Sequence, residues 1–265
     1  SNTTIPGIQE AIFINDNNIV LRYLDGDVVK SFAGFLASST PDQTLSGQFL
    51  PDVHKIFRLS NTSILLYTKT GLGSRVDIAS LDGTAPRTIF SSPISSWVTS
   101  VTGSDIFLTN APTGLGTGYM YRLDEGALEK VFGGFDGLMT LPSADGRYVA
   151  YSATASDRST FGVFDRTNGE ITPLPAGTFA SKCVWLPGGE TLFCGVPITR
   201  SAGLLPDDWL MGEISRTAEI ILSLDETART PIDVMEPVVS PDGQYVLFTN
   251  KNDSSLWSLK LNQAP

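Results

Sequence analysis

One pattern of hydrophobic and polar positions recurs six times along the chain. Each copy is an apolar run of four or five residues that ends at a small or polar residue and a turn. Such runs are typical of buried β-strands. The copies follow one another at steps of 54, 41, 43, 43 and 54 residues, so the sequence predicts a β protein built from repeats of about 40 to 50 residues. The steps are counted between Ile14, Thr68, Thr109, Ser152, Gly195 and Thr249.

The unit at residues 137–175 shows the organisation of one repeat most clearly. Asp145-Gly146 and Asn168-Gly169 supply the positive φ that tight hairpins require, and they separate short apolar runs. The unit is therefore predicted to be one antiparallel meander of four strands. The expected strands are Leu138–Leu141, Tyr148–Ser152, Phe161–Phe164 and Ile171–Leu174.

Four-stranded repeats of this length predict an all-β propeller, a single domain over residues 1–265. Strands such as Ser63–Tyr67 and Tyr245–Phe248 are apolar on both faces, which suits sheets stacked face to face. We expect six four-stranded blades, with five as an alternative, and a sandwich or solenoid as the competing architecture. Residues 3–6 resemble Thr172–Pro175, a fourth-strand segment, so the N-terminal segment is expected to complete the last blade.

Two units carry a recognisable turn motif. Ser143-Ala144-Asp145-Gly146 and Ser240-Pro241-Asp242-Gly243 each precede an apolar strand. They resemble the WD40-like (PD40) repeat of TolB-type propellers, whose signature is a Ser-Pro-Asp-Gly turn followed by such a strand. The resemblance implies the fold more than the activity, because proteins of this type include periplasmic scaffolds and the non-catalytic propellers of serine peptidases.

The charge balance argues against two classes of partner. The net charge is −10 and the isoelectric point is about 4.5, so the chain lacks the clustered Lys and Arg that nucleic acids and anionic membranes attract. No apolar stretch is long enough to insert into a bilayer. The opening Ser1-Asn2 resembles the remnant of a protease site, so we expect a missing leader or anchor. The expected location is extracytoplasmic: secreted, periplasmic or tethered at the cell surface.

Two long insertions are the candidate binding loops. They cover residues 35–52, between the first two units, and 197–213, between the second and third strands of the fifth unit. In a propeller both kinds of connection emerge on one face, and long loops in compact domains are often functional. The expected partner is a protein, a peptide or a glycan. Alternatively, Trp209 folds back and caps its blade. The candidate contact residues are Phe49, Arg200, Asp207, Asp208 and Trp209.

The only two cysteines, Cys183 and Cys194, flank the turn at 187–190, and this turn would place them opposite each other on neighbouring strands. The pair is either a disulfide or two buried thiols. The similar glycine-rich segments at 70–74 and 113–117 lead into strands rather than helices, so they are interpreted as duplicated turns and not as nucleotide sites.

No catalytic residue, metal site or cofactor is expected from the motifs. His54 is the only histidine, and no Gly-x-Ser-x-Gly elbow accompanies it, which argues against a Ser-His-Asp hydrolase. Carboxylates could still converge in three dimensions as an acid and base pair or a calcium site. The candidates for such convergence are Asp16, Asp42, Asp52, Asp105, Asp207, Asp208 and Glu213.

The sequence therefore favours a non-enzymatic binding or scaffold propeller, which we expect to be monomeric. Two alternatives stay open. One is a carboxylate-based hydrolase or lyase acting on a sugar or lactone. The other is the non-catalytic propeller of a larger enzyme.

Overall fold

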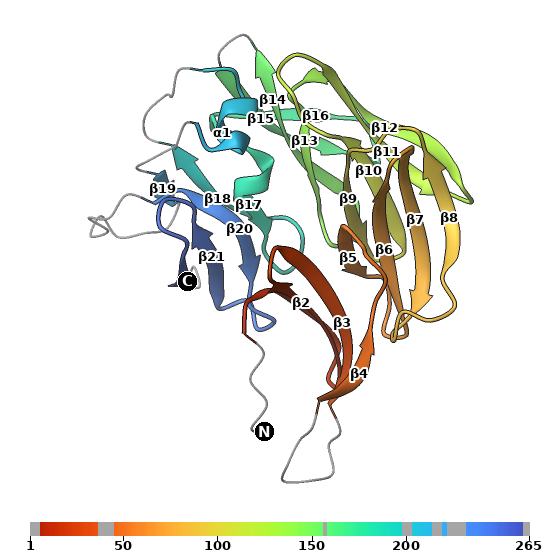
Figure 1. The fold of residues 1–265 in the computed structure, drawn as a ribbon. Helices are drawn as coiled ribbons and strands as arrows, with labels where there is room; N and C mark the ends of the chain where they lie inside the picture. Colours follow the sequence, from red (N-terminus) through yellow and green to blue (C-terminus); the bar gives the residue numbers. More distant parts are fainter. Residues whose placement is uncertain are drawn as a thin grey trace. The chain divides into compact units, whose positions relative to one another are not determined.

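The computed structural model describes residues 6–36, 45–155, 158–197, 203–213, 219–221 and 232–261. Consecutive strands in these ranges pair as antiparallel meanders, because turns such as those at Gly146 and Gly169 adopt the positive φ that a tight reversal needs (Figure 1). None of the helices in these ranges is long and apolar enough to cross a membrane.

The chain divides into two compact units, which we call the N-terminal unit (residues 1–107 and 123–129) and the C-terminal unit (residues 108–122 and 130–265). The sheet β9 to β12 contributes residues to both units. The prediction of a single domain stays a prediction.

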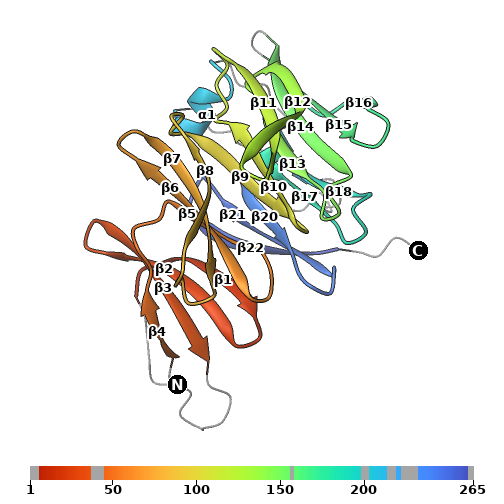
Figure 2. The ribbon, with the colours of Figure 1, turned by 90° about the vertical axis from the view of Figure 1, so that its right-hand side faces the viewer.

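Three four-stranded sheets make up the first half of the chain (Figure 2). The first contains β1 (Ile8–Asn15), β2 (Asn18–Asp25), β3 (Val28–Leu36) and β4 (Leu45–Phe49). The second contains β5 (Lys55–Arg58), β6 (Ser63–Thr70), β7 (Gly73–Ser80) and β8 (Arg87–Ser92). The third contains β9 (Trp97–Thr102), β10 (Asp105–Asn110), β11 (Thr117–Asp124) and β12 (Ala127–Asp136).

The second half of the described chain forms one four-stranded and two three-stranded sheets. The four-stranded sheet contains β13 (Met139–Pro142), β14 (Tyr148–Ala155), β15 (Arg158–Asp165) and β16 (Ile171–Leu174). A 3₁₀ turn, η1 (Ala180–Lys182), leads to β17 (Cys183–Trp185), β18 (Leu192–Pro197), the helix α1 (Asp207–Met211) and β19 (Glu219–Ile221). The last sheet contains β20 (Val234–Val239), β21 (Tyr245–Asn250) and β22 (Ser255–Lys260).

The predicted fold class is confirmed: the chain is an all-β protein of the propeller class. Five blades are found in the described part of the chain, which is the alternative to the six that the sequence led us to expect. The best-predicted unit is the sheet β13 to β16, whose last strand has the expected bounds. The segment expected to complete the last blade falls largely on residues 1–5, which lie outside the described residues.

The first repeat needs a correction. Ile14 lies in β1, the first strand of its sheet, whereas the expected period had placed it in a second strand. The error arose because β1 and β2 are both apolar, so hydrophobicity alone does not tell which strand is which. Residues 35–52 are also not one long loop, because 45–49 form β4 and Phe49 pairs with Phe32 of β3.

Each unit has its own hydrophobic core. In the N-terminal unit a cluster that includes Ile14, Val20 and Ile64 joins the first two sheets. In the C-terminal unit a second cluster includes Phe179 and Trp209, so it extends from the sheets to α1. This second cluster fixes the position of the loop that carries the candidate site.

Candidate functional site

The 203–213 loop is built around one buried side chain, Trp209. Its residue is 3% exposed, and its ring lies 5.0 Å from the ring of Phe179, centroid to centroid. The indole Nε1 donates to Oδ2 of Asp233 at 3.2 Å. The candidate partner-contact residue Trp209 is thus an internal anchor, and for this side chain the structure agrees with the capping alternative.

A buried ion pair lies beneath Trp209. Lys182 and Asp233 are both fully buried, and the Lys182 ammonium donates to the Asp233 carboxylate. The Lys182 Nζ atom also donates to the backbone oxygen of Val234 at 3.3 Å and lies 4.8 Å from the centre of the Trp209 ring. A buried charge persists in a protein core only when it is paired and hydrogen-bonded, and here both conditions hold.

Lys251 is a second cation near the Trp209 ring. Its Nζ lies 4.1 Å from the centre of the Trp209 ring and donates to the Trp209 backbone oxygen. Burial lowers the pKa of the Lys251 ammonium, the Asp233 carboxylate opposes this shift, and Lys182 adds to it. Two ammonium groups therefore lie near one indole ring, and cation–π attraction adds to the hydrogen bonds that hold the loop.

Asp207 and Asp208 hold the backbone of the loop. The Asp207 Oδ2 atom accepts a hydrogen bond from the amide of Gly114 at 2.7 Å, and Oδ2 of Asp208 accepts one from the amide of Leu204 at 2.7 Å. Both carboxylates thus have structural partners within the C-terminal unit. Arg200, the remaining candidate from this loop, lies outside the described residues.

The glycine-rich segment at 113–117 packs directly against the 203–213 loop. A Cβ atom on Gly114 would lie only 2.3 Å from the backbone oxygen of Leu205, so the close approach of the two backbones requires glycine. Thr154 adds a hydrogen bond from its hydroxyl to the same Leu205 oxygen at 3.0 Å. The duplicated segment at 70–74 lacks this role, because a Cβ on Gly71 would meet nothing within 4 Å.

Around this anchored backbone, four aliphatic side chains are exposed. We call them the α1 surface: Leu115, Leu204, Leu210 and Met211, of which Leu115 is 80% and Met211 72% exposed. Leu204, Leu210 and Met211 come from the loop and α1, and Leu115 is next to Gly114. The loop thus buries one large side chain and presents several others.

Phe49, the candidate from the first insertion, lies in the N-terminal unit. It is 64% exposed, and its ring lies 5.4 Å from that of Phe32 in an edge-to-face contact. Residues 37–44 lie outside the described residues. A role for Phe49 in binding stays a prediction.

The structure contains a disulfide between Cys183 and Cys194, with Sγ atoms 2.07 Å apart. The two residues are directly opposed on β17 and β18, in the register that the turn at 187–190 predicted. The bond lies in the same hydrophobic cluster as Phe179 and Trp209. It therefore cross-links the sheet on which the 203–213 loop rests.

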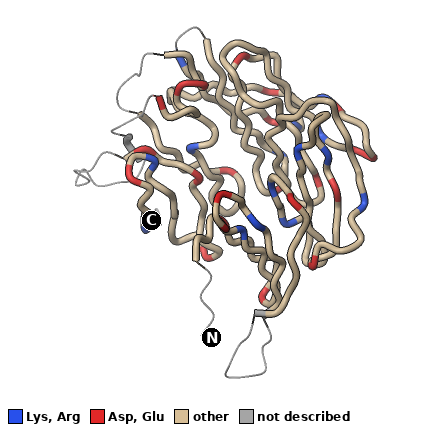
Figure 3. Tube along the Cα trace, viewed as in Figure 1, with Lys and Arg blue, Asp and Glu red and all other residues tan. Residues whose placement is uncertain are grey.

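The acidic residues do not form a metal site within the described ranges, where no group of three or more His, Cys, Asp or Glu side chains could hold an ion. Asp42, one of the residues considered for such convergence, lies outside these ranges. Basic and acidic residues are interspersed along the trace (Figure 3).

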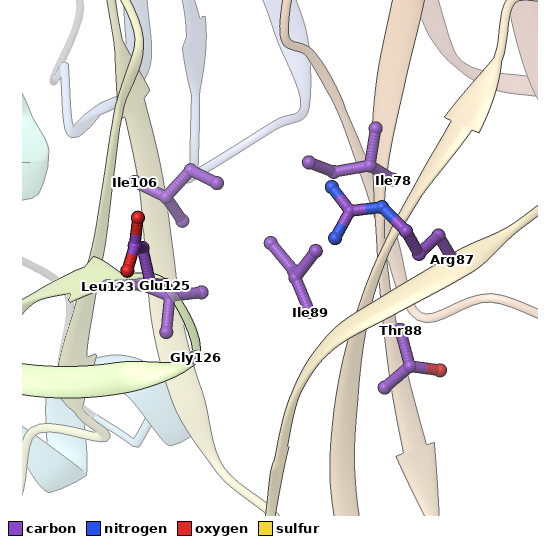
Figure 4. A pocket seen from close by; sticks show the side chains of 8 residues that line it. All are labelled: Ile78, Arg87, Thr88, Ile89, Ile106, Leu123, Glu125 and Gly126. Carbon is purple, nitrogen blue, oxygen red and sulfur yellow. The ribbon is translucent and has the colours of Figure 1, made fainter.

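A pocket of about 500 Å³ lies in the N-terminal unit between β7–β8 and the β10–β12 strands (Figure 4). Its walls are mainly aliphatic, with Arg87 on one side and Glu125 on the other. Ile89 is the extra residue of a β-bulge, since Val76 pairs with Phe90 and Asp77 pairs with Thr88. Sequence reasoning missed this pocket, because a bulge leaves no mark in the apolar pattern.

No family model and no curated protein matches the chain. Solved structures do match. An oligogalacturonate lyase in complex with manganese aligns with 98% of this chain and 79% of its own, at 12% identity and a TM-score of 0.61. The complex of KlAtg21 with the coiled-coil of AgAtg16 aligns with 97% and 82%, at 14% identity and a TM-score of 0.58. The tricorn protease aligns with 96% of this chain at 10% identity and a TM-score of 0.55, and this chain spans 33% of it.

These similarities show the propeller fold and not an activity, because every identity is low and the matched proteins include both enzymes and binding proteins. TolB from Acinetobacter baumannii is among the matched structures, with a TM-score of 0.49. Because no family model matches the chain, the TolB-type repeat family stays a resemblance of two turn motifs.

Proposed function

We propose that the chain is a non-enzymatic recognition propeller that binds a protein or peptide through the α1 surface. The observation that carries the proposal is the contrast within one short loop. Trp209 is buried, with a hydrogen bond to Asp233 and cation–π contacts to Lys182 and Lys251. Leu210 and Met211, the next two residues in the sequence, are exposed.

An exposed aliphatic group on a rigid support is the arrangement that favours binding. When a partner binds, the apolar surface of these side chains is removed from water, which is favourable. Because the backbone that carries them is already ordered, binding costs little additional conformational entropy. The α1 surface offers aliphatic groups rather than aromatic rings, and such groups are stabilised by burial against apolar side chains of a protein partner. This is why we favour a protein or peptide over a glycan.

The experiment is a selection of displayed peptides on the immobilised protein, followed by affinity measurements on two variants. Leu210→Asp with Met211→Asp places charges on the α1 surface and is expected to weaken binding of the selected peptides about tenfold or more. Leu24→Asp with Leu72→Asp is the matched control, because it adds the same two charges at exposed leucines of the N-terminal unit. Equal binding to all three proteins would contradict the proposal.

We also propose an extracytoplasmic location, supported by the disulfide between Cys183 and Cys194. Disulfides persist in oxidising compartments and are rare where thiols are kept reduced. Alkylation of free thiols at the moment of cell lysis, followed by mass measurement of the protein, tests this. Unmodified cysteines are expected, whereas two alkylated cysteines would argue for a reducing compartment.

A further inference from the structure

A second pocket in the N-terminal unit has a different chemistry from the rest of this acidic protein. It has a volume of about 550 Å³, within the usual range for small-molecule sites. Its walls come from the turn between β2 and β3, from the segment before β5 and from the end of β6. The lining residues that carry charge or can acquire it are Arg22, Asp27, Asp52, His54, Lys55 and Lys69.

The lining of this pocket carries three cations, Arg22, Lys55 and Lys69, and two carboxylates, Asp27 and Asp52, whereas the whole chain carries a net charge of −10. Glu10 pairs with Arg22, so the two lysines are the cations available to an anion. Within the described residues neither lysine forms an ion pair. Lysines held in a concave wall without acidic partners attract anions.

The Arg22 side chain is held in place by two contacts. Its Nη1 atom pairs with the Glu10 carboxylate at 2.9 Å, and Nη2 donates to the backbone oxygen of Val53 at 3.4 Å. These contacts hold the guanidinium in place, and its side chain is only 12% exposed. The Nε atom is buried, yet no acceptor in the described part of the chain receives its hydrogen. Arg22 thus places a fixed guanidinium in the wall of the pocket.

The pKa of His54 indicates the sign of the electrostatic potential in the pocket. Burial lowers the pKa of its imidazole, and Lys69, Arg22 and Lys55 lower it further, while Asp52 alone opposes them. Asp27 also lines the pocket, and the ring of Tyr67 lies 5.9 Å from the imidazole. The nearby charges are therefore positive in sum, and an anion placed among them would raise the pKa of His54.

From these observations we infer that the pocket formed by Arg22, His54, Lys55 and Lys69 binds a small molecule through a carboxylate or phosphate group. The two lysines would supply the charge that attracts the anion, and the guanidinium of Arg22 would form a fixed part of the wall beside it. This site is separate from the α1 surface, so neither proposal depends on the other.

The test uses His54 as its own probe, because a single histidine gives one resolvable imidazole signal in NMR spectra. The protein is titrated with citrate or with inorganic phosphate, at an ionic strength held constant with sodium chloride. A saturable shift of the His54 signal and a raised pKa are expected. Saturation by citrate alone would assign the site to carboxylates, and saturation by phosphate alone would assign it to phosphate.

Two variants separate a site from general charge attraction. Lys55→Gln with Lys69→Gln is expected to weaken the anion affinity about tenfold or more, because both lysines line the pocket. Lys130→Gln with Lys260→Gln removes the same charge from the C-terminal unit and is expected to leave the affinity unchanged. No saturation with either anion, or equal weakening in both variants, would overturn the inference.

Discussion

The indole nitrogen of Trp209 donates to the carboxylate of Asp233 at 3.2 Å across 24 positions of sequence. Trp209 lies in a short helix between two strands of one sheet, and Asp233 immediately precedes the first strand of the next sheet. One hydrogen bond thus ties a surface loop to the start of β20. The Lys182 ammonium shares the same carboxylate, so the loop, η1 and β20 meet at a single buried group.

Trp209→Phe tests this anchor. The change withdraws the indole N–H from Asp233 and removes part of a buried ring, and it is expected to lower the free energy of unfolding by about 1 to 3 kcal/mol. Urea denaturation measures the change. Trp257→Phe is the matched control, since Trp257 donates only to Ser255 two residues away, and a smaller loss is expected there. Equal losses would contradict the role given to Asp233.

The buried ion pair predicts a strongly non-additive double variant. Asp233→Asn leaves the Lys182 ammonium buried without its counter-charge, at an expected cost of about 3 to 5 kcal/mol in unfolding free energy. Adding Lys182→Met removes that unpaired charge, so the double variant should be less destabilised than the sum of the two single variants. Urea denaturation of all four proteins completes the cycle. Strict additivity would mean that the two groups do not interact.

Gly114 and Gly71 occupy corresponding positions in the two duplicated segments but should respond differently to alanine. Gly114→Ala would place a Cβ 2.3 Å from the Leu205 oxygen and displace the 203–213 loop from the segment at 113–117. Faster amide hydrogen exchange is expected at Leu210 and Gly212, whose amides donate within the loop. Gly71→Ala has open space and should leave the exchange rates unchanged. The same exchange rates in both variants would show that the contact between Gly114 and Leu205 does not hold the loop in place.

Acid stability should depend on Asp165. Hydrogen bonds from Thr167 and Arg147 lower the pKa of this carboxyl to about 2 from a reference value of 3.8. Because the pKa is lower in the folded state, Asp165 contributes stability above the reference pKa and loses it as the pH falls toward 2. Asp165→Asn should therefore flatten the decline of the urea midpoint over this range, and Thr167→Val should flatten it in part. A decline as steep as in the unchanged protein would contradict the assignment.

The sheets could be predicted because their turns are local. Gly146 and Gly169 follow Asp145 and Asn168 and adopt positive φ. The strands after these turns begin where the sequence predicts them. The opposed positions of Cys183 and Cys194 followed from the same local logic. Where two neighbouring strands are equally apolar, as around Ile14, the pattern shows strands but not their order.

The site could be predicted only in part, because its contacts join distant segments. The insertion that carries Trp209 was visible as an interruption of the repeat, but its anchor depends on Lys182, at the start of the same repeat, and on Asp233, which precedes the next sheet. A lysine within the apolar segment 179–185 was the one available signal, since an unpaired lysine is rarely buried. The pocket around Arg22 likewise gathers residues from four strands and turns.

The most direct test of the proposed function is a crystal structure of the protein with a peptide selected on it. We expect the peptide to contact Leu204, Leu210 and Met211 while Trp209 keeps its hydrogen bond to Asp233. A peptide bound elsewhere, with these three side chains left in solvent, would contradict it.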